Sequence, residues 1–283
     1  MHRTTSPFLL DVTFPPSGTV VVVHAHPDDE AIFTANAVRL LADRGLRVVL
    51  VTATDGGAGV PRVPLRRGET IRDRRLRELE DAAGLLGVAR LVVLPFADSG
   101  SHAGPYVAGS LGAADVEDVA RRVRRVAETE AAHSVVHYDP RGVYGHVDHV
   151  RVHQAGDRVA SDLGLTAYEA TVDPLALRDG PRHVLAQAAG ELLDVGLPAD
   201  DITFAVRADD ALLDTKMRAM AVHASQIGPE YLDGTAEGYR HEWFVRRGPA
   251  GPVDAALAGH VVAPRQAAAD LAGRARDLVA VAS

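Results

Sequence analysis

Cysteine is absent from this 283-residue chain, and lysine occurs only once, at Lys216. Without cysteine the protein forms no disulfide bond and no thiolate metal site, which fits a reducing cytoplasm, so we expect a cytoplasmic location. No apolar run approaches the ~20 residues that a membrane-spanning helix needs. The first residues also lack an apolar stretch long enough for a secretory signal. We therefore expect no membrane span.

The charge of the chain argues against a polyanionic partner. The formal net charge is -8, with 30 basic and 38 acidic residues, so the chain has no long-range attraction for nucleic acid or an anionic membrane. A stretch around residues 121–125 carries four arginines. They lie opposite an apolar helix face, which favours a solvated helix surface over a nucleic-acid patch.

Short apolar runs alternate with stretches of helical period, which predicts an α/β fold. The runs are residues 19–25, 47–54, 90–96 and 133–138. Continuous Val/Leu runs of this kind indicate strands buried on both faces, as in parallel sheets. Residues 74–87 and 116–127 read as amphipathic helices between them, the first ending in a glycine. We expect a Rossmann-like three-layer sandwich with a mostly parallel sheet and a less regular C-terminal portion.

Beyond residue 165 the pattern is weaker. Residues 166–172 and 201–208 look like further strands, residues 211–224 like a helix, and 246–254 like a flexible connection. An Ala-rich tail follows, for which we expect one or two packing helices.

The turn after the first predicted strand lacks glycine, which argues against a dinucleotide site. It reads HAHPDDE, whereas a nucleotide-binding turn carries G-x-G-x-x-G so that backbone amides approach a pyrophosphate. Three acids after a proline also suit the first turn of a helix. His26 and Asp29, three residues apart, are close enough to share one cation.

A second polar cluster follows the fourth predicted strand. Residues 138–153 read YDPRGVYGHVDHVRVH and contain His146, Asp148, His149 and His153. Ligands of open parallel sheets bind beyond the carboxyl ends of the strands. Two clusters at two strand ends therefore predict one shared metal site.

The paired boxes AHPDDE and YGHVDH resemble those of the LmbE-like/PIG-L zinc-dependent de-N-acetylases, a family that includes the mycothiol-pathway deacetylase. The resemblance is strong over about residues 19–155. It implies that His26, Asp29 and His149 bind the metal. One departure is Val147, where the family usually has proline. Proline would stiffen the turn before His149, and its replacement by valine removes no ligand.

The resemblance also implies catalytic roles. Asp28 matches the general base, His146 the histidine that faces the substrate carbonyl, Asp148 the acid that orients a histidine, and Tyr144 a tyrosine that adjusts to substrate. We expect a protonated His146, held by Asp148, to stabilise the oxyanion. We also expect adjacent cationic charge to depress the pKa of Asp28.

Substrate contacts are implied at Arg75, next to Arg74 and Arg77, and at Asp98, with His102 in the same loop. A glycine-rich loop at residues 54–59 suits either a phosphate cradle or a rim of the site. The family's late His-x-x-Gln helix corresponds to His223 and Gln226. His24 and His153 read as packed histidines or as neighbours of the ligands.

These features predict a hydrolase that removes an acetyl group from an N-acetylated, GlcNAc-type sugar or a related small amide through zinc-activated water. The same ligands suit Fe(II), and a non-catalytic binding module is the alternative from another class. We expect residues 1–165 to form the metal-binding core. Residues 166–245 would form the substrate rim of the same domain, and residues 246–283 a helical tail.

Overall fold

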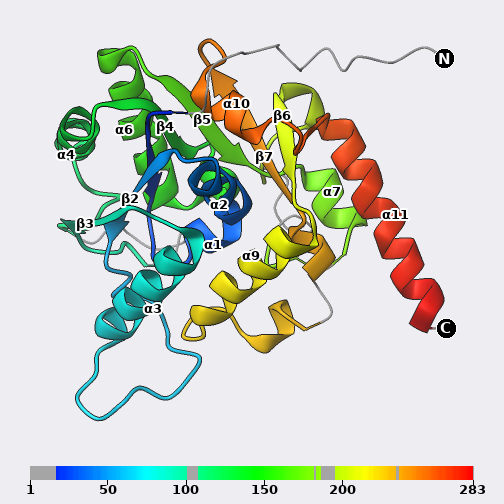
Figure 1. Ribbon diagram of the computed structural model, residues 1–283. Coiled ribbons are helices and arrows are strands. Elements are labelled where there is room, and N and C mark those ends of the chain that lie inside the picture. Colours follow the sequence, from blue (N-terminus) through cyan, green and yellow to red (C-terminus); the bar gives the residue numbers. More distant parts are fainter. Residues whose placement is uncertain (1–16, 101–107, 182, 186–194, 234–235, 283) are drawn as a thin grey trace.

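The computed structural model describes residues 17–100, 108–181, 183–185, 195–233 and 236–282. Its centre is an eight-stranded sheet with the strand order β3-β2-β1-β4-β5-β7-β6-β8 (Figure 1). The strands are β1 (Thr19–His24), β2 (Arg47–Thr54), β3 (Arg90–Phe96), β4 (Ala132–Tyr138), β5 (Thr166–Thr171), β6 (Phe204–Arg207), β7 (His241–Arg247) and β8 (Val261–Val262). The five strands from β3 to β5 are parallel, and the remaining pairs are antiparallel.

Helices cover both faces of this sheet. They are α1 (Asp29–Phe33), α2 (Ala35–Asp43), α3 (Ile71–Leu86), α4 (Val116–Thr129), α5 (Gly142–Gly145), α6 (Val147–Leu163), α7 (Pro174–Asp179), α9 (Asp210–Val222), α10 (Pro252–Leu257) and α11 (Pro264–Ala282). Short 3₁₀ turns occupy Ala199–Asp201, Pro229–Tyr231 and Ala236–Tyr239. Helices α4 and α6 pack together on one face, and α2, α3 and α9 pack on the other (Figure 1). The predicted α/β fold with a mostly parallel sheet is confirmed.

The valine runs form the central strands because both of their faces are covered. Val20 to Val23 of β1 are almost completely buried, as are Val48 to Val51 of β2. β-branched side chains suit this pleated, fully buried position. The contiguous Val/Leu runs of the sequence therefore form the buried centre of the sheet.

Most predicted helices and strands lie where the sequence places them. Helix α3 ends at Gly87, whose left-handed φ of 75° terminates the helix as predicted. On α4, Arg121 pairs with Asp118, and Arg124 pairs with Glu117 and Asp162, which supports the reading as a solvated surface. Residues 246–254 are not simply a connection, because β7 continues to Arg247 and α10 begins at Pro252.

The C-terminal elements continue the same sheet and also contact the N-terminal ones. Glu242 of β7 accepts hydrogen bonds from the N–H groups of Asn36 and Ala37 at the start of α2, at 2.8 and 2.9 Å. Lys216 of α9 pairs with Glu242 at 2.7 Å and also donates to the carbonyl of Ile32 at 2.8 Å. This buried pair caps α2, which follows the candidate metal-binding turn after the short helix α1.

Strands β1 and β4 lie side by side, and their chains leave the sheet toward opposite faces. Such a point, where the strand order reverses, leaves a crevice beyond the carboxyl ends of the strands. Both polar clusters of the sequence open into this crevice. Among the described residues no helix is both long enough and apolar enough to cross a bilayer.

Candidate metal centre

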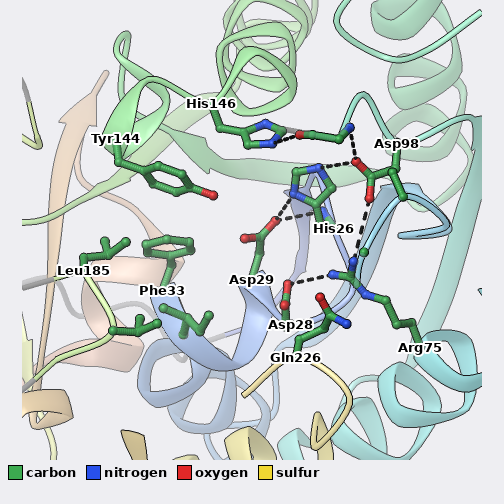
Figure 2. Close-up of a pocket in the computed structure, with 15 residues that line it drawn as sticks. His26, Asp28, Asp29, Phe33, Arg75, Asp98, Tyr144, His146, Leu185 and Gln226 are labelled. Atoms are coloured by element: carbon green, nitrogen blue, oxygen red, sulfur yellow. Dashed lines mark hydrogen bonds and ion pairs between the residues drawn. The ribbon is translucent and has the colours of Figure 1, made fainter. Parts of the chain in front are cut away.

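The turn after β1 has an unusual backbone. Asp28 has φ 132° and ψ -25°, a conformation that non-glycine residues rarely adopt and that costs about 1–3 kcal/mol. Helix α1 then begins at Asp29, whose Oδ2 accepts the backbone N–H of His26 at 2.8 Å. The turn therefore directs Asp28, Asp29 and His26 toward one space (Figure 2).

The turn after β4 places His149 beside them. This turn needs Gly142, with φ 62°, because a Cβ there would lie 2.7 Å from the Cβ of His149. His149 Nε2 lies 3.3 Å from His26 Nδ1 and 3.3 Å from Asp29 Oδ1. Donors that share a tetrahedral zinc at about 2.0–2.1 Å are ~3.3–3.4 Å apart. His26 Nδ1 is in turn 3.4 Å from the other carboxylate oxygen, Asp29 Oδ2. The spacing of these three residues therefore suits one small divalent cation.

The other nitrogen of His26 faces a second acidic group. Its Nε2 is 3.0 Å from Asp148 Oδ2 and 3.6 Å from Asp98 Oδ1. Burial opposes protonation of His26, but hydrogen bonds to Asp148 and Asp29 outweigh it and raise its pKa to about 10. The cluster thus favours positive charge at its centre.

Two groups of side chains in this region have the composition of a metal site: His26, His146 and His149, and His26, Asp98 and Asp148. A ligating imidazole usually donates its other N–H to a carboxylate. Asp148 is the carboxylate that accepts the Nε2–H of His26. The Nδ1 atom of His26 is left to face Asp29 and His149.

The expected pairing of Asp148 with His146 is wrong in its detail. The Asp148 carboxylate binds His26 and also accepts the backbone N–H of Ser99 at 2.9 Å, so the histidine that it orients is His26. His146 Nε2 donates to the carbonyl of Gly100 at 2.8 Å, and its Nδ1 accepts the backbone N–H of Asp148. With both nitrogens engaged, His146 is less suited than His149 as a ligand.

The protonation state expected for His146 is also corrected. Burial, together with the nearby His26 and His149, lowers the pKa of His146 to about 4. The side chain is therefore a neutral imidazole with a donating Nε2–H. Val147 begins α6 directly after His146, at a position where proline is also favoured, so the replacement leaves the turn intact.

Asp28 faces the same space from below in Figure 2, next to Arg75. Burial raises the pKa of Asp28 to about 6, more than the Arg75 guanidinium lowers it. The expected depression by adjacent cationic charge is present in the contribution of Arg75, but burial, which the sequence does not reveal, acts on the pKa in the opposite direction. Arg75 Nη2 is 3.3 Å from Asp28 Oδ1, and Nη1 is 3.7 Å from Asp98 Oδ2.

Helix α3 settles which arginine points inward. Arg75 is buried, and it donates to the carbonyls of Gly56 and Pro27 at 3.1 and 2.8 Å. Arg74 and Arg77 instead pair with Glu69, away from the site. The glycine-rich loop therefore serves as a rim of the site, bound to Arg75. His102 lies outside the described residues.

A cavity of about 350 Å³ opens over these groups, a volume in the range of small-molecule sites. One wall is polar and comprises Arg75, Asp98 and Gln226, and the other is apolar and comprises Ile32, Phe33, Val184 and Leu185 (Figure 2). Tyr144 and His146 line it on the β4 side. The arrangement suits a ligand with a polar ring and an adjacent apolar group.

Several residues of the site were not given roles by sequence reasoning. Tyr138, the last residue of β4, donates its hydroxyl proton to Asp29 Oδ2 at 2.7 Å. Glu30 Oε2 accepts the backbone N–H of Asp28 at 3.1 Å, and Glu30 Oε1 is 2.5 Å from His223 Nε2. The only available signal was the position of Tyr138 at a strand end beside the second cluster.

The late His-x-x-Gln element does reach the site. Gln226 lines the cavity, while His223 is buried behind it and pairs with Glu30. His24 is packed, with hydrogen bonds to Tyr138 and Thr34. His153 lies close to the carbonyl of Tyr138, at 3.0 Å.

The sequence of the chain matches those of known proteins. The profile of the GlcNAc-PI de-N-acetylase family, PIG-L, matches residues 21–160. A 1D-myo-inositol 2-acetamido-2-deoxy-alpha-D-glucopyranoside deacetylase of Kineococcus radiotolerans is 33% identical over 248 residues, covering 74% of this chain and 68% of that protein. A protein of the same name from Nakamurella multipartita is 33% identical over 245 residues, covering 76% and 81%.

Solved structures share the fold. The zinc-inhibited form of teicoplanin deacetylase Orf2 has a TM-score of 0.57 at 19% identity, covering 82% of this chain and all of that one (100%). The A40926 pseudoaglycone deacetylase Dbv21 has a TM-score of 0.55 at 16% identity, covering 82% and 98%.

Proposed function

The chain belongs to the GlcNAc-PI de-N-acetylase (PIG-L) family, and from this premise we propose that it is a divalent-metal-dependent hydrolase. It removes the acetyl group from the amino group of an N-acetylglucosamine-type sugar that carries a further substituent. The observation that carries the proposal is the approach of His149 Nε2 to within 3.3 Å of both His26 Nδ1 and Asp29 Oδ1.

His26, Asp29 and His149 would hold the cation. A divalent cation there supplies Lewis-acid polarisation of the amide oxygen and lowers the pKa of water to ~7. Zinc suits two imidazoles and one carboxylate, and Fe(II) suits them as well.

Asp28 acts as the general base. Its carboxylate, oriented by Arg75 at 3.3 Å, takes a proton from the attacking water as the new C–O bond forms at the acetamide carbon. The amide π electrons move onto the carbonyl oxygen. The electron pair on the oxyanion then re-forms the C=O bond as the C–N bond breaks, and the Asp28 carboxyl returns the proton to the amine nitrogen. The free amino sugar leaves with acetic acid, which loses its proton to solvent to become acetate. General acid-base catalysis of this kind contributes about 10²–10⁴ in rate.

His146 stabilises the tetrahedral state. Its neutral Nε2–H now donates to the carbonyl of Gly100, and it turns this proton toward the oxyanion when substrate is bound. A single oxyanion donor contributes about 3–4 kcal/mol. Tyr144 lines the cavity beside it and adjusts to the bound sugar.

The polar wall would bind the sugar hydroxyl groups. Arg75 and Asp98 present charged hydrogen-bonding groups to the cavity, and Gln226 presents an amide. The relatives named above are deacetylases of a GlcNAc-inositol, which suggests an N-acetylglucosaminide as the substrate class.

The test is release of free amine from a panel of N-acetylglucosaminides by protein that has been stripped of metal and reloaded with Zn²⁺ or Fe²⁺. We expect turnover only with metal. Asp28→Asn should keep stoichiometric metal and lose about 10²–10⁴ in kcat, whereas the control Asp214→Asn, at an exposed position, should leave kcat unchanged. Normal turnover by Asp28→Asn would refute the assigned base, and amine release without metal would refute the metal mechanism.

A further inference from the structure

Tyr138 is a fully buried tyrosine that the reaction above does not use, yet it contacts two of the three proposed ligands. Its hydroxyl is 2.7 Å from Asp29 Oδ2. Its ring stacks on the imidazole of His149, with centroids 4.1 Å apart and planes 7° from parallel. One side chain on β4 thus touches a ligand from each of the two turns.

The hydrogen-bond partners of the Tyr138 hydroxyl fix the direction of every proton around it. The backbone N–H of Ala25 donates to this oxygen at 2.9 Å, and His24 Nδ1 lies 3.0 Å from it. A phenol has one proton, and the ionised Asp29 carboxylate can only accept, so that proton goes to Asp29. His24 Nδ1 must then carry a proton and donate, while its Nε2 accepts the hydroxyl proton of Thr34 at 2.8 Å.

This arrangement selects one oxygen of Asp29. Oδ2 accepts two protons, one from the Tyr138 hydroxyl and one from the backbone N–H of His26. A carboxylate oxygen has about two lone-pair sites, so Oδ2 is saturated. Oδ2 lies 3.4 Å from His26 Nδ1, but these two donors already occupy its lone pairs. Oδ1, which faces His149 Nε2 at 3.3 Å, is the oxygen left for the cation.

The stack also fixes the plane of His149. A ligating imidazole is usually oriented by a hydrogen bond from its other ring nitrogen. Among the described residues, His149 Nδ1 is buried and has no such partner. The aromatic ring of Tyr138, parallel to the imidazole, takes the place of that hydrogen bond.

We propose that Tyr138 is the positioning residue of the metal centre: its hydroxyl makes Asp29 a one-oxygen ligand through Oδ1, and its ring sets the plane of His149. His24, the last residue of β1, holds the hydroxyl in place, and Thr34 at the junction of α1 and α2 holds His24. The inference rests on the proposed function, because it assumes that Asp29 and His149 bind a divalent cation.

The test uses the metal alone as the probe. Zn²⁺ affinity is measured by competition with a chromogenic chelator, and the Co²⁺ form is examined by visible absorption, which reports the coordination geometry. Tyr138→Phe keeps the ring and removes the hydroxyl. We expect Zn²⁺ affinity to fall about 10–100-fold and the Co²⁺ spectrum to shift toward higher coordination, because Oδ2 is freed.

The chain offers a matched control in the neighbouring strand. Tyr168 of β5 is also buried, and its hydroxyl donates to another carboxylate, Asp254 Oδ2, at 2.6 Å. Tyr168→Phe should lose a comparable hydrogen bond and leave the Zn²⁺ affinity and the Co²⁺ spectrum unchanged. A general loss of sheet stability would affect both variants alike.

The outcomes separate this inference from the function on which it rests. Wild-type protein that binds no stoichiometric Zn²⁺ contradicts the proposed function. Wild-type protein that binds Zn²⁺, with Tyr138→Phe equal to Tyr168→Phe in affinity and spectrum, overturns the role of the Tyr138 hydroxyl and leaves the proposed function standing. If Tyr138→Phe does not fold, a Zn²⁺-bound wild-type structure decides the matter: ligation through Oδ1 alone supports the inference, and ligation through Oδ2 or both oxygens overturns it.

Discussion

The turns after β1 and β4 supply all of the proposed metal ligands, whereas the elements after β5 supply side chains that hold the turn after β1 and the helices α2 and α3 in place. His26, Asp29 and His149 lie within the first 165 residues. His223 of the C-terminal portion binds Glu30, Ser225 binds Glu78 at 2.6 Å, and Lys216 with Glu242 caps α2. The C-terminal portion therefore forms a framework that supports the site from behind, and it also forms one of its walls.

The largest effect should come from removing a ligand on the N-terminal side. His149→Ala should abolish stoichiometric Zn²⁺ binding and measurable turnover, because two donors do not hold a catalytic cation. His153→Ala is the control, one helical turn further along α6, and should retain both. Metal content by elemental analysis checks this. A His149→Ala protein with one tightly bound Zn²⁺ would show that His149 is not a required ligand.

A variant of the framework should instead cost stability. Lys216→Met leaves Glu242 buried without its cation, which typically costs about 3–5 kcal/mol. In the double variant Lys216→Met/Glu242→Gln, the buried charge is removed and the amide oxygen can still accept one of the two α2 N–H groups, so part of the loss should be recovered. Urea denaturation measures both. A single variant within ~0.5 kcal/mol of wild type would show that the pair does not contribute to the framework.

A smaller, more selective effect is expected at His223. This side chain is paired with Glu30, which accepts the backbone N–H of the strained Asp28. His223→Leu should lower kcat about tenfold by loosening Asp28, with unchanged Zn²⁺ affinity, because the Asp29 contacts remain. His223→Gln keeps a donor and should restore most of kcat. An equal fall in Zn²⁺ affinity would mean that His223 supports the ligands instead of the base.

The mostly parallel sheet could be predicted from the sequence, and a ligand set could be proposed from it, because the strand runs and the two polar clusters are local patterns. The valine runs are contiguous, and His26 and Asp29 are three residues apart in one turn. The contacts that were missed are long-range: Tyr138 is 109 residues from Asp29, and Glu30 is 193 residues from His223. No periodicity or spacing within one segment reports such a pair.

The errors within the site have the same origin. Asp148 was assigned to His146, two residues away, but its carboxylate binds His26, which is 122 residues away. At Asp28 the expected lowering of the pKa by a nearby cation is present in Arg75, but burial outweighs it and raises the pKa to about 6. Nearby charges are visible in a sequence, whereas burial depends on how the whole chain packs.

The most direct test of the account is anomalous diffraction at the zinc absorption edge from crystals of the Zn²⁺-loaded protein. We predict one peak within bonding distance, about 2.0–2.2 Å, of His26 Nδ1, Asp29 Oδ1 and His149 Nε2. A peak on the other side of His26, between its Nε2 and the carboxylates of Asp98 and Asp148, would contradict it.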